Sequence, residues 1–203
     1  PSDFKGRGYK KARRHFSILA VMFGVIGEYD GDVRFQEYAP AARELFAKAG
    51  KNCKVGSTGA YTEAKLRKDD LQDLVSGGGI EAPGMVEKAA KWVTVCDRAP
   101  LMQRLEDAIQ QNLQPMTASK SEFAAQGDMI LHEAEMVAVM AEVLCKAGME
   151  DADDDSYTAF SQQMKKSARD VVDAVKLNND EAARKAVGEI NKACSECHEN
   201  YRG

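Results

Sequence analysis

The last ten residues of the chain hold its most constraining pattern. Cys194 and Cys197 are separated by two residues, and His198 follows directly. On a helix the two cysteines share one face, so both sulfurs reach the same side of a porphyrin and the imidazole reaches its iron. This spacing is the attachment pattern of c-type haem. The sequence therefore predicts one covalently attached haem c, with His198 as the proximal ligand of the iron.

Half of a zinc site is the alternative interpretation of the same residues. Structural zinc needs four ligands, usually in two close pairs, and Cys53, Cys96 and Cys145 form no second pair. We therefore expect haem, and with it a periplasmic or otherwise exported protein. In an oxidising compartment Cys53 and Cys96 are candidates for a disulfide, whereas Cys145, in an apolar helical stretch, is expected to be a buried thiol.

Length and composition limit the function classes. The chain has 203 residues, 30% of them charged, and a net charge of −4. It lacks the basic excess of nucleic-acid-binding proteins. The longest apolar run, 18–26, is far shorter than the ~20 residues that cross a bilayer. We expect no nucleic-acid partner and no membrane span.

Helical periodicity dominates the sequence, and no stretch has a strand pattern. Glycines at 77–79 interrupt the pattern, Ser119 and Glu122 match a capping box, and the acidic run 151–155 is suited to cap a helix. The expected helices cover 8–28, 33–48, 62–75, a segment from Pro83, a segment from Pro100, 119–146, 156–177 and the stretch after 179. The sequence thus predicts an all-α fold.

Two stretches resemble the cytochrome c′ family, a haem-bearing four-helix bundle. Residues 187–202, which end in Tyr-Arg after the haem motif, are similar to the family's closing helix, and 16–24 are similar to its first helix. The resemblance implies a four-helix bundle of cytochrome c′ type with an additional helical insertion. We expect a single haem-binding domain over 1–203, with the insertion at about 51–118 and with 119–147 as the second helix of the bundle.

The resemblance also implies a residue on the open side of the iron. Registered on the family's first helix, Phe16 takes that place and would leave a five-coordinate iron behind an apolar lid. The family's arginine one turn earlier falls at Ala12, so its neighbour Arg13 is the candidate to contact the haem. Low-spin relatives place a methionine near the start of this helix, and none precedes Met22.

Three further residues are candidates near the haem. Arg202 follows His198 by one helical turn, and the resemblance places it near the proximal imidazole or a propionate. His132 and His15 are the alternative sixth ligands, although a lone histidine is more often solvated or hydrogen-bonded. A second histidine on the iron would close it to gases.

The expected function is one-electron transfer by a monohaem cytochrome with a redox partner protein. Binding of nitric oxide or carbon monoxide is the first alternative. A small haem peroxidase or reductase is the second, but it needs polar groups that handle protons, and Phe16 is apolar; we therefore expect no enzymatic activity. A homodimer remains open. The stretches from 15 and from 132 share an order of histidine, apolar helix, acidic loop and second helix, and an internal duplication is one interpretation.

Overall fold

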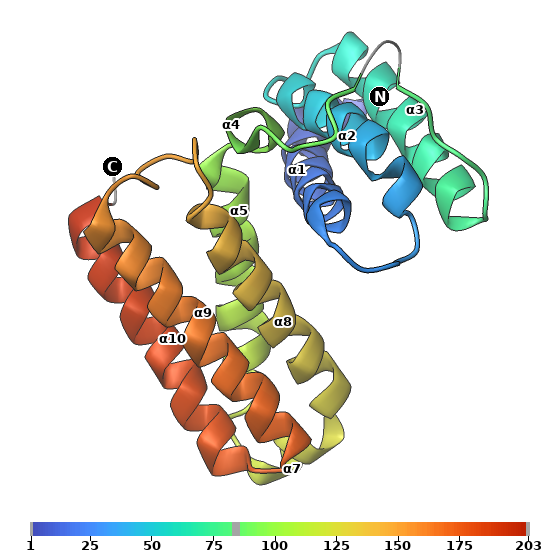
Figure 1. The fold of residues 1–203 in the computed structure, drawn as a ribbon. Coiled ribbons are helices and arrows are strands. Elements are labelled where there is room, and N and C mark those ends of the chain that lie inside the picture. The colour runs from blue at the N-terminus through green and yellow to red at the C-terminus, as the bar shows by residue number, and fades with distance from the viewer. Residues whose placement is uncertain (1, 83–85, 202–203) are drawn as a thin grey trace. The chain divides into compact units, whose positions relative to one another are not determined.

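The computed structural model describes residues 2–82 and 86–201 (Figure 1). Every regular element in this part of the chain is a helix, which confirms the all-α prediction. The chain divides into two compact units, residues 1–101 and 102–203. The division lies inside the expected insertion at 51–118, so that segment does not form a unit of its own. No helix among the described residues is both long and apolar enough to cross a membrane.

The N-terminal unit begins with one long helix. A π-helical turn η1 (Phe4–Gly8) continues into α1 (Tyr9–Glu28), as predicted for 8–28. The 3₁₀ turn η2 (Gln36–Tyr38) precedes α2 (Ala39–Asn52), which begins later than predicted because Phe35 has a left-handed φ of 71°.

Two further helices follow in this unit. The helix α3 (Thr58–Val75) starts where Ser57 accepts a hydrogen bond from the Ala60 amide at 3.0 Å, four residues before the predicted start. The helix expected after Pro83 is only the short α4 (Trp92–Val95). Pro83 itself lies outside the described residues.

Aromatic side chains fill the space between α1 and α2. The rings of Phe16 and Phe46 are stacked with centroids 6.0 Å apart, and Phe23 stacks on Phe46 at 5.5 Å. All three side chains are buried. The apolar side of α1 is therefore covered by α2 within the N-terminal unit.

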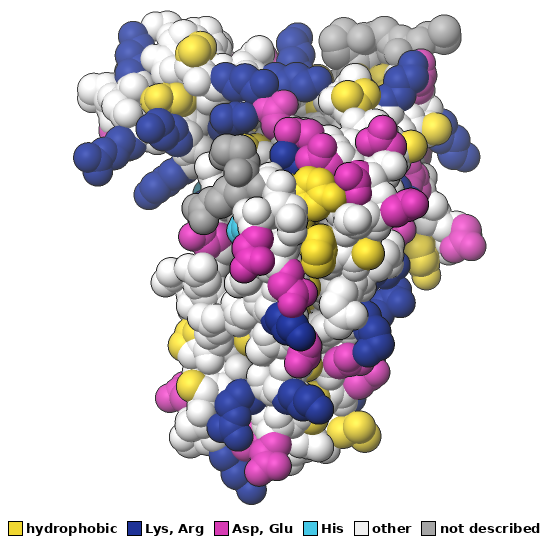
Figure 2. All heavy atoms as spheres, turned by 90° about the vertical axis from the view of Figure 1, so that its left-hand side faces the viewer, with side chains coloured by type: hydrophobic (Ala, Val, Ile, Leu, Met, Phe, Trp, Pro, Cys, Tyr) yellow, Lys and Arg dark blue, Asp and Glu magenta, His cyan; other side chains and the backbone are white. Residues whose placement is uncertain are grey.

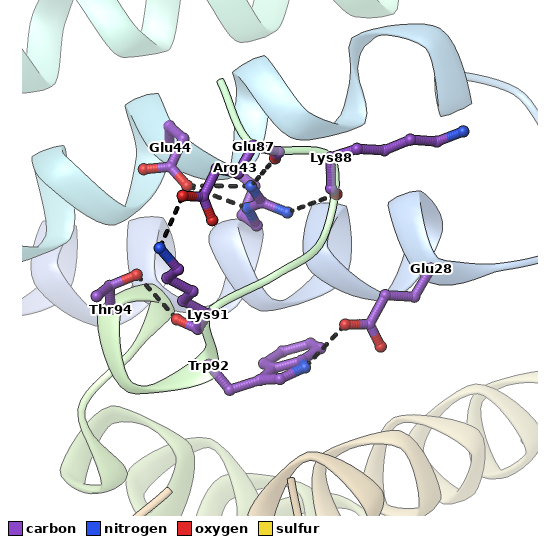
Figure 3. A network of polar contacts seen from close by, with 8 residues as sticks. All are labelled: Glu28, Arg43, Glu44, Glu87, Lys88, Lys91, Trp92 and Thr94. Atoms are coloured by element: carbon purple, nitrogen blue, oxygen red, sulfur yellow. Dashed lines mark hydrogen bonds and ion pairs between the residues drawn. The ribbon is translucent and has the colours of Figure 1, made fainter. Parts of the chain in front are cut away.

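A strap, residues 86–92, crosses this helix pair (Figure 3). The buried Arg43 side chain of α2 donates hydrogen bonds to the carbonyls of Glu87 at 2.6 Å and Lys88 at 3.1 Å. The Trp92 indole donates to Glu28 at 2.9 Å. A Cβ at Gly24 would lie 2.9 Å from the Trp92 ring, so glycine permits this close approach. The strap is thus held by both α1 and α2.

The C-terminal unit contains four long helical segments. The first combines α5 (Arg98–Glu106), which crosses the boundary between the units, the π-helical η3 (Asp107–Leu113) and α6 (Gln114–Met116). The short α7 (Lys120–Ala125) starts at the predicted cap Ser119 and precedes α8 (Gly127–Leu144). The last two are α9 (Asp155–Lys176) and α10 (Asp180–Tyr201).

These segments form a four-helix bundle (Figure 1). The helix α9 packs along both α8 and α10, and η3 contacts α8 and α10. Arg104 of α5 and the buried Glu133 of α8 form an ion pair at 2.8 Å. The first helix of this bundle is therefore 98–116, which corrects the expectation that 8–28 takes this place. The reason is that the apolar side of α1 is already buried against α2.

Candidate functional site

The haem motif lies on the last two turns of α10. The buried face of this helix consists of small and branched residues that end at Ala193. Cys194 and Cys197 continue this face and are half-buried, whereas His198 is exposed. The sequence folds this way because its apolar residues recur every three to four positions up to the motif. The two thiols consequently lie at the edge of the bundle core.

Cys194 contacts the neighbouring helix. Its thiol lies 3.7 Å from the thioether sulfur of Met164 on α9. Burial, and to a lesser extent the nearby Cys197, raises the pKa of Cys194 to about 11. The thiol is therefore neutral at pH 7, and its surroundings are apolar, as the flat face of a porphyrin requires.

Tyr201 fastens the end of α10 to the start of α9. Its ring meets the buried ring of Tyr157 edge-on at 5.3 Å. Its hydroxyl bonds to Asp154, which lowers the pKa of that carboxyl together with the amides of Tyr157 and Ser156. Asp154 is the N-cap of α9, which confirms the predicted capping by the acidic run. The motif is thus placed on a helix end that is held in position.

The residues present suit a covalently attached haem. Neither motif cysteine is in a disulfide. Nowhere in 2–82 and 86–201 do three histidine, cysteine or acidic side chains gather as a metal site, so the motif has no further ligands for zinc. Two cysteine side chains on one helix face beside an exposed imidazole are the donor set that haem c uses.

The other predicted site residues fall into both units. His132, on α8, lies in the same unit as the motif and is exposed. Phe16, Arg13 and His15 lie in the N-terminal unit, so the structure does not bring them into one unit with the motif. Arg202 lies outside the described residues.

The N-terminal candidates have partners of their own. Arg13 forms an ion pair with Asp97 at 2.8 Å, and Phe16 is stacked on Phe46. Partial burial and the neighbouring Arg14 and Lys11 lower the pKa of His15.

The other cysteines are free thiols. Cys53 and Cys96 are buried, and neither forms the disulfide that the sequence left open. Burial raises the pKa of Cys96 to about 12. Cys145 is only partly buried, which differs from the expected buried thiol, and burial raises its pKa as well. None of these thiols joins the motif.

Sequence reasoning missed the partners of the motif on α9. The helices α9 and α10 form an antiparallel pair joined by a short turn, so residues equidistant from the turn lie side by side. Met164 with Cys194 and Tyr157 with Tyr201 are both centred on position 179. Aligning the apolar residues of the two helices antiparallel across the turn at Asn178 and Asn179 would have predicted both contacts.

The C-terminal unit is thus an antiparallel four-helix bundle whose last helix ends in the pattern of c-type haem attachment. Comparison with protein families agrees: the family model described as Cytochrome C' matches residues 152–202, which confirms the resemblance over α9 and α10. No curated protein and no solved structure matches the chain.

Proposed function

We propose that the C-terminal unit holds one haem c and that the protein transfers single electrons. Cys194 and Cys197 would hold the porphyrin, and His198 would bind its iron. When bound, the haem supplies an iron that alternates between the ferric and ferrous states. The observation that carries this proposal is the half-buried thiol pair at the end of α10, within the segment that matches the cytochrome c′ family.

The chain's own residues would hold the haem in place and exclude water from it. Met164 and Ala193 present apolar groups beside the thiols, and burial of a haem raises its reduction potential by disfavouring the charged ferric form. The contacts of Tyr201 with Tyr157 and Asp154 hold the motif at the core. The apolar groups beside Cys194 favour a carrier over an enzyme, which needs polar groups that handle protons.

Electron transfer and gas binding differ in which residue lies on the open side of the iron and whether it binds the iron. The resemblance assigns it to the first helix of the bundle, and in this structure that helix is α5 with η3. The start of α5 and the end of α10 lie at the same end of the bundle (Figure 1). We therefore propose the half-buried Met102 of α5, in place of Phe16, as the residue on this side.

Gas binding is the second candidate function. A thioether is a weak iron ligand, and if Met102 lies beside the iron without binding it, nitric oxide or carbon monoxide has access. Absorption and EPR spectra of the purified protein, with and without carbon monoxide, distinguish the two. A low-spin spectrum indifferent to carbon monoxide supports electron transfer alone, whereas a high-spin one that changes supports gas binding.

The test of the haem itself is a mass measurement. The intact protein, exported by an expression host that attaches haem c, should carry the mass of one haem that organic solvent does not extract. Cys194→Ser and Cys197→Ser should each leave a single thioether. A haem-free wild-type protein from that host would contradict the proposal, and with it the exported location that we infer from covalent attachment.

A further inference from the structure

The N-terminal unit repeats the order of the last three helices. Ten residues connect α1 to α2 and ten connect α8 to α9. Five of the six buried positions of α1 recur 117 residues later as buried positions of α8, and His15 falls on His132 at the same spacing. Buried positions of α2 recur in α9 at a spacing of 118, with Phe46 falling on Met164.

The repeat lacks the haem ligands. Buried Ala60, Ala64 and Arg67 of α3 recur 123 residues later as Ala183, Val187 and Ile190 of α10. At this spacing Cys194, Cys197 and His198 correspond to Leu71, Leu74 and Val75. Leucine and valine neither attach a porphyrin nor bind iron.

Aromatic side chains occupy the interior of this unit. Phe46, the counterpart of the Met164 that touches Cys194, is enclosed by Phe16 and Phe23. Because its interior is filled by aromatic side chains, we expect the N-terminal unit to act through its surface.

The surfaces of the two units differ in charge. Residues 1–101 contain 17 Lys and Arg against 13 Asp and Glu, a net charge of +4, whereas 102–203 contain 11 against 19, a net charge of −8. Figure 2 shows one face of the molecule, on which Lys and Arg side chains gather at the top and both signs of charge are interspersed below. A net charge of −4 for the whole chain conceals this separation.

The positive charge is concentrated on one side of the first helix. Arg7, Lys10, Lys11 and Arg14 are spaced three and four residues apart and form a single basic stripe. The first three are exposed, and among the described residues none of these three forms an ion pair. The only acidic residue between positions 1 and 27 is Asp3. Along the chain the stripe precedes the buried residues of α1, which begin at Phe16.

We propose that this basic stripe is a docking surface for an acidic segment of a partner protein. Complementary charges accelerate encounter and fix orientation, and four cations on two helical turns match a run of carboxylates. A lipid surface is disfavoured because a helix that lies in a membrane needs an exposed apolar side, and that side of α1 is buried against α2. The proposal does not depend on haem.

Binding to poly-L-glutamate tests the stripe in the complete haem-loaded protein. The triple variant R7E/K10E/K11E reverses the three exposed cations. The control K48E/K65E/K68E makes the same change of charge at exposed lysines of α2 and α3. At low salt we expect the stripe variant to bind at least about tenfold more weakly and the control less than threefold, as the modest free energy of surface ion pairs implies. Binding of the wild type should vanish at high salt.

Two results would overturn the proposal. Equal weakening in both triple variants would mean that only the net charge of the unit matters. Binding to phosphatidylglycerol vesicles without binding to polyglutamate would assign the stripe to an anionic lipid surface. The helical circular dichroism of each variant checks that it is folded, and its haem absorbance reports separately on the proposed function.

Discussion

Arg43 provides a quantitative test of how the N-terminal unit is held together. The substitution Arg43→Met keeps the apolar stem and removes the guanidinium that donates to the carbonyls of Glu87 and Lys88. Hydrogen bonds from a charged group contribute roughly 1.5–3 kcal/mol each. Both carbonyls belong to exposed residues that can turn to water, so the lower value applies to each. We expect a loss of about 3 kcal/mol in the free energy of unfolding.

An opposing effect makes this result informative. The Arg43 side chain is only 1% exposed, and the desolvation of a buried cation costs several kcal/mol, so that an apolar replacement is sometimes stabilising. Arg34 is the matched control, because it donates to the Val75 carbonyl at 2.7 Å on the surface. Arg34→Met should cost less than about 0.5 kcal/mol, as surface substitutions do.

The assay is urea unfolding followed by tryptophan fluorescence. Trp92 is the only tryptophan of the chain and ends the strap that Arg43 holds, so its signal reports on the N-terminal unit. With a slope of about 1–1.5 kcal/mol per M urea, the midpoint of Arg43→Met should fall by roughly 2–3 M. A midpoint equal to or above that of the wild type would mean that desolvation outweighs the hydrogen bonds. An equal fall in Arg34→Met would mean that burial is not the cause.

Three further predictions follow from the C-terminal unit and the first helix. Gly188→Ala should stabilise the protein by about 1 kcal/mol, because a Cβ there meets nothing within 4 Å on a helix, whereas Gly24→Ala should destabilise it by clashing with the indole; thermal unfolding measures both. Tyr201→Phe should lose stability at neutral pH and less at acidic pH, because the lowered pKa of Asp154 contributes stability that is present above pH ~4 and lost as the pH falls through the folded-state value; melts between pH 3 and 7 that run parallel to those of the wild type would contradict this. If the thioether binds the iron, Met102→Ala should convert a low-spin ferric spectrum to a high-spin one while Phe16→Ala leaves it unchanged. A high-spin wild type whose carbon monoxide binding changes in Phe16→Ala and not in Met102→Ala would restore Phe16 to the open side.

Helical periodicity was sufficient to predict most of the elements. The helices at 8–28, 156–177 and after 179 appear within one or two residues of their predicted bounds, because long amphipathic patterns with clear caps leave little choice. The helix expected after Pro83 is mostly an irregular strap instead. Its carbonyls are satisfied by the side chain of Arg43, a distant partner that local pattern does not reveal.

The sequence by itself determined the haem motif, the all-α class and the resemblance of the last two helices. The spacing of Cys194, Cys197 and His198 is a local property of the sequence, and so is the apolar periodicity of each helix. Both can therefore be recognised without the rest of the fold. Only the tertiary structure decided which helix completes the bundle, because several apolar helices compete for the same partners. The aromatic side of α1 is buried by Phe46 of α2, while Arg104 joins α5 to α8, and these long-range contacts assign the first helix of the C-terminal bundle to 98–116.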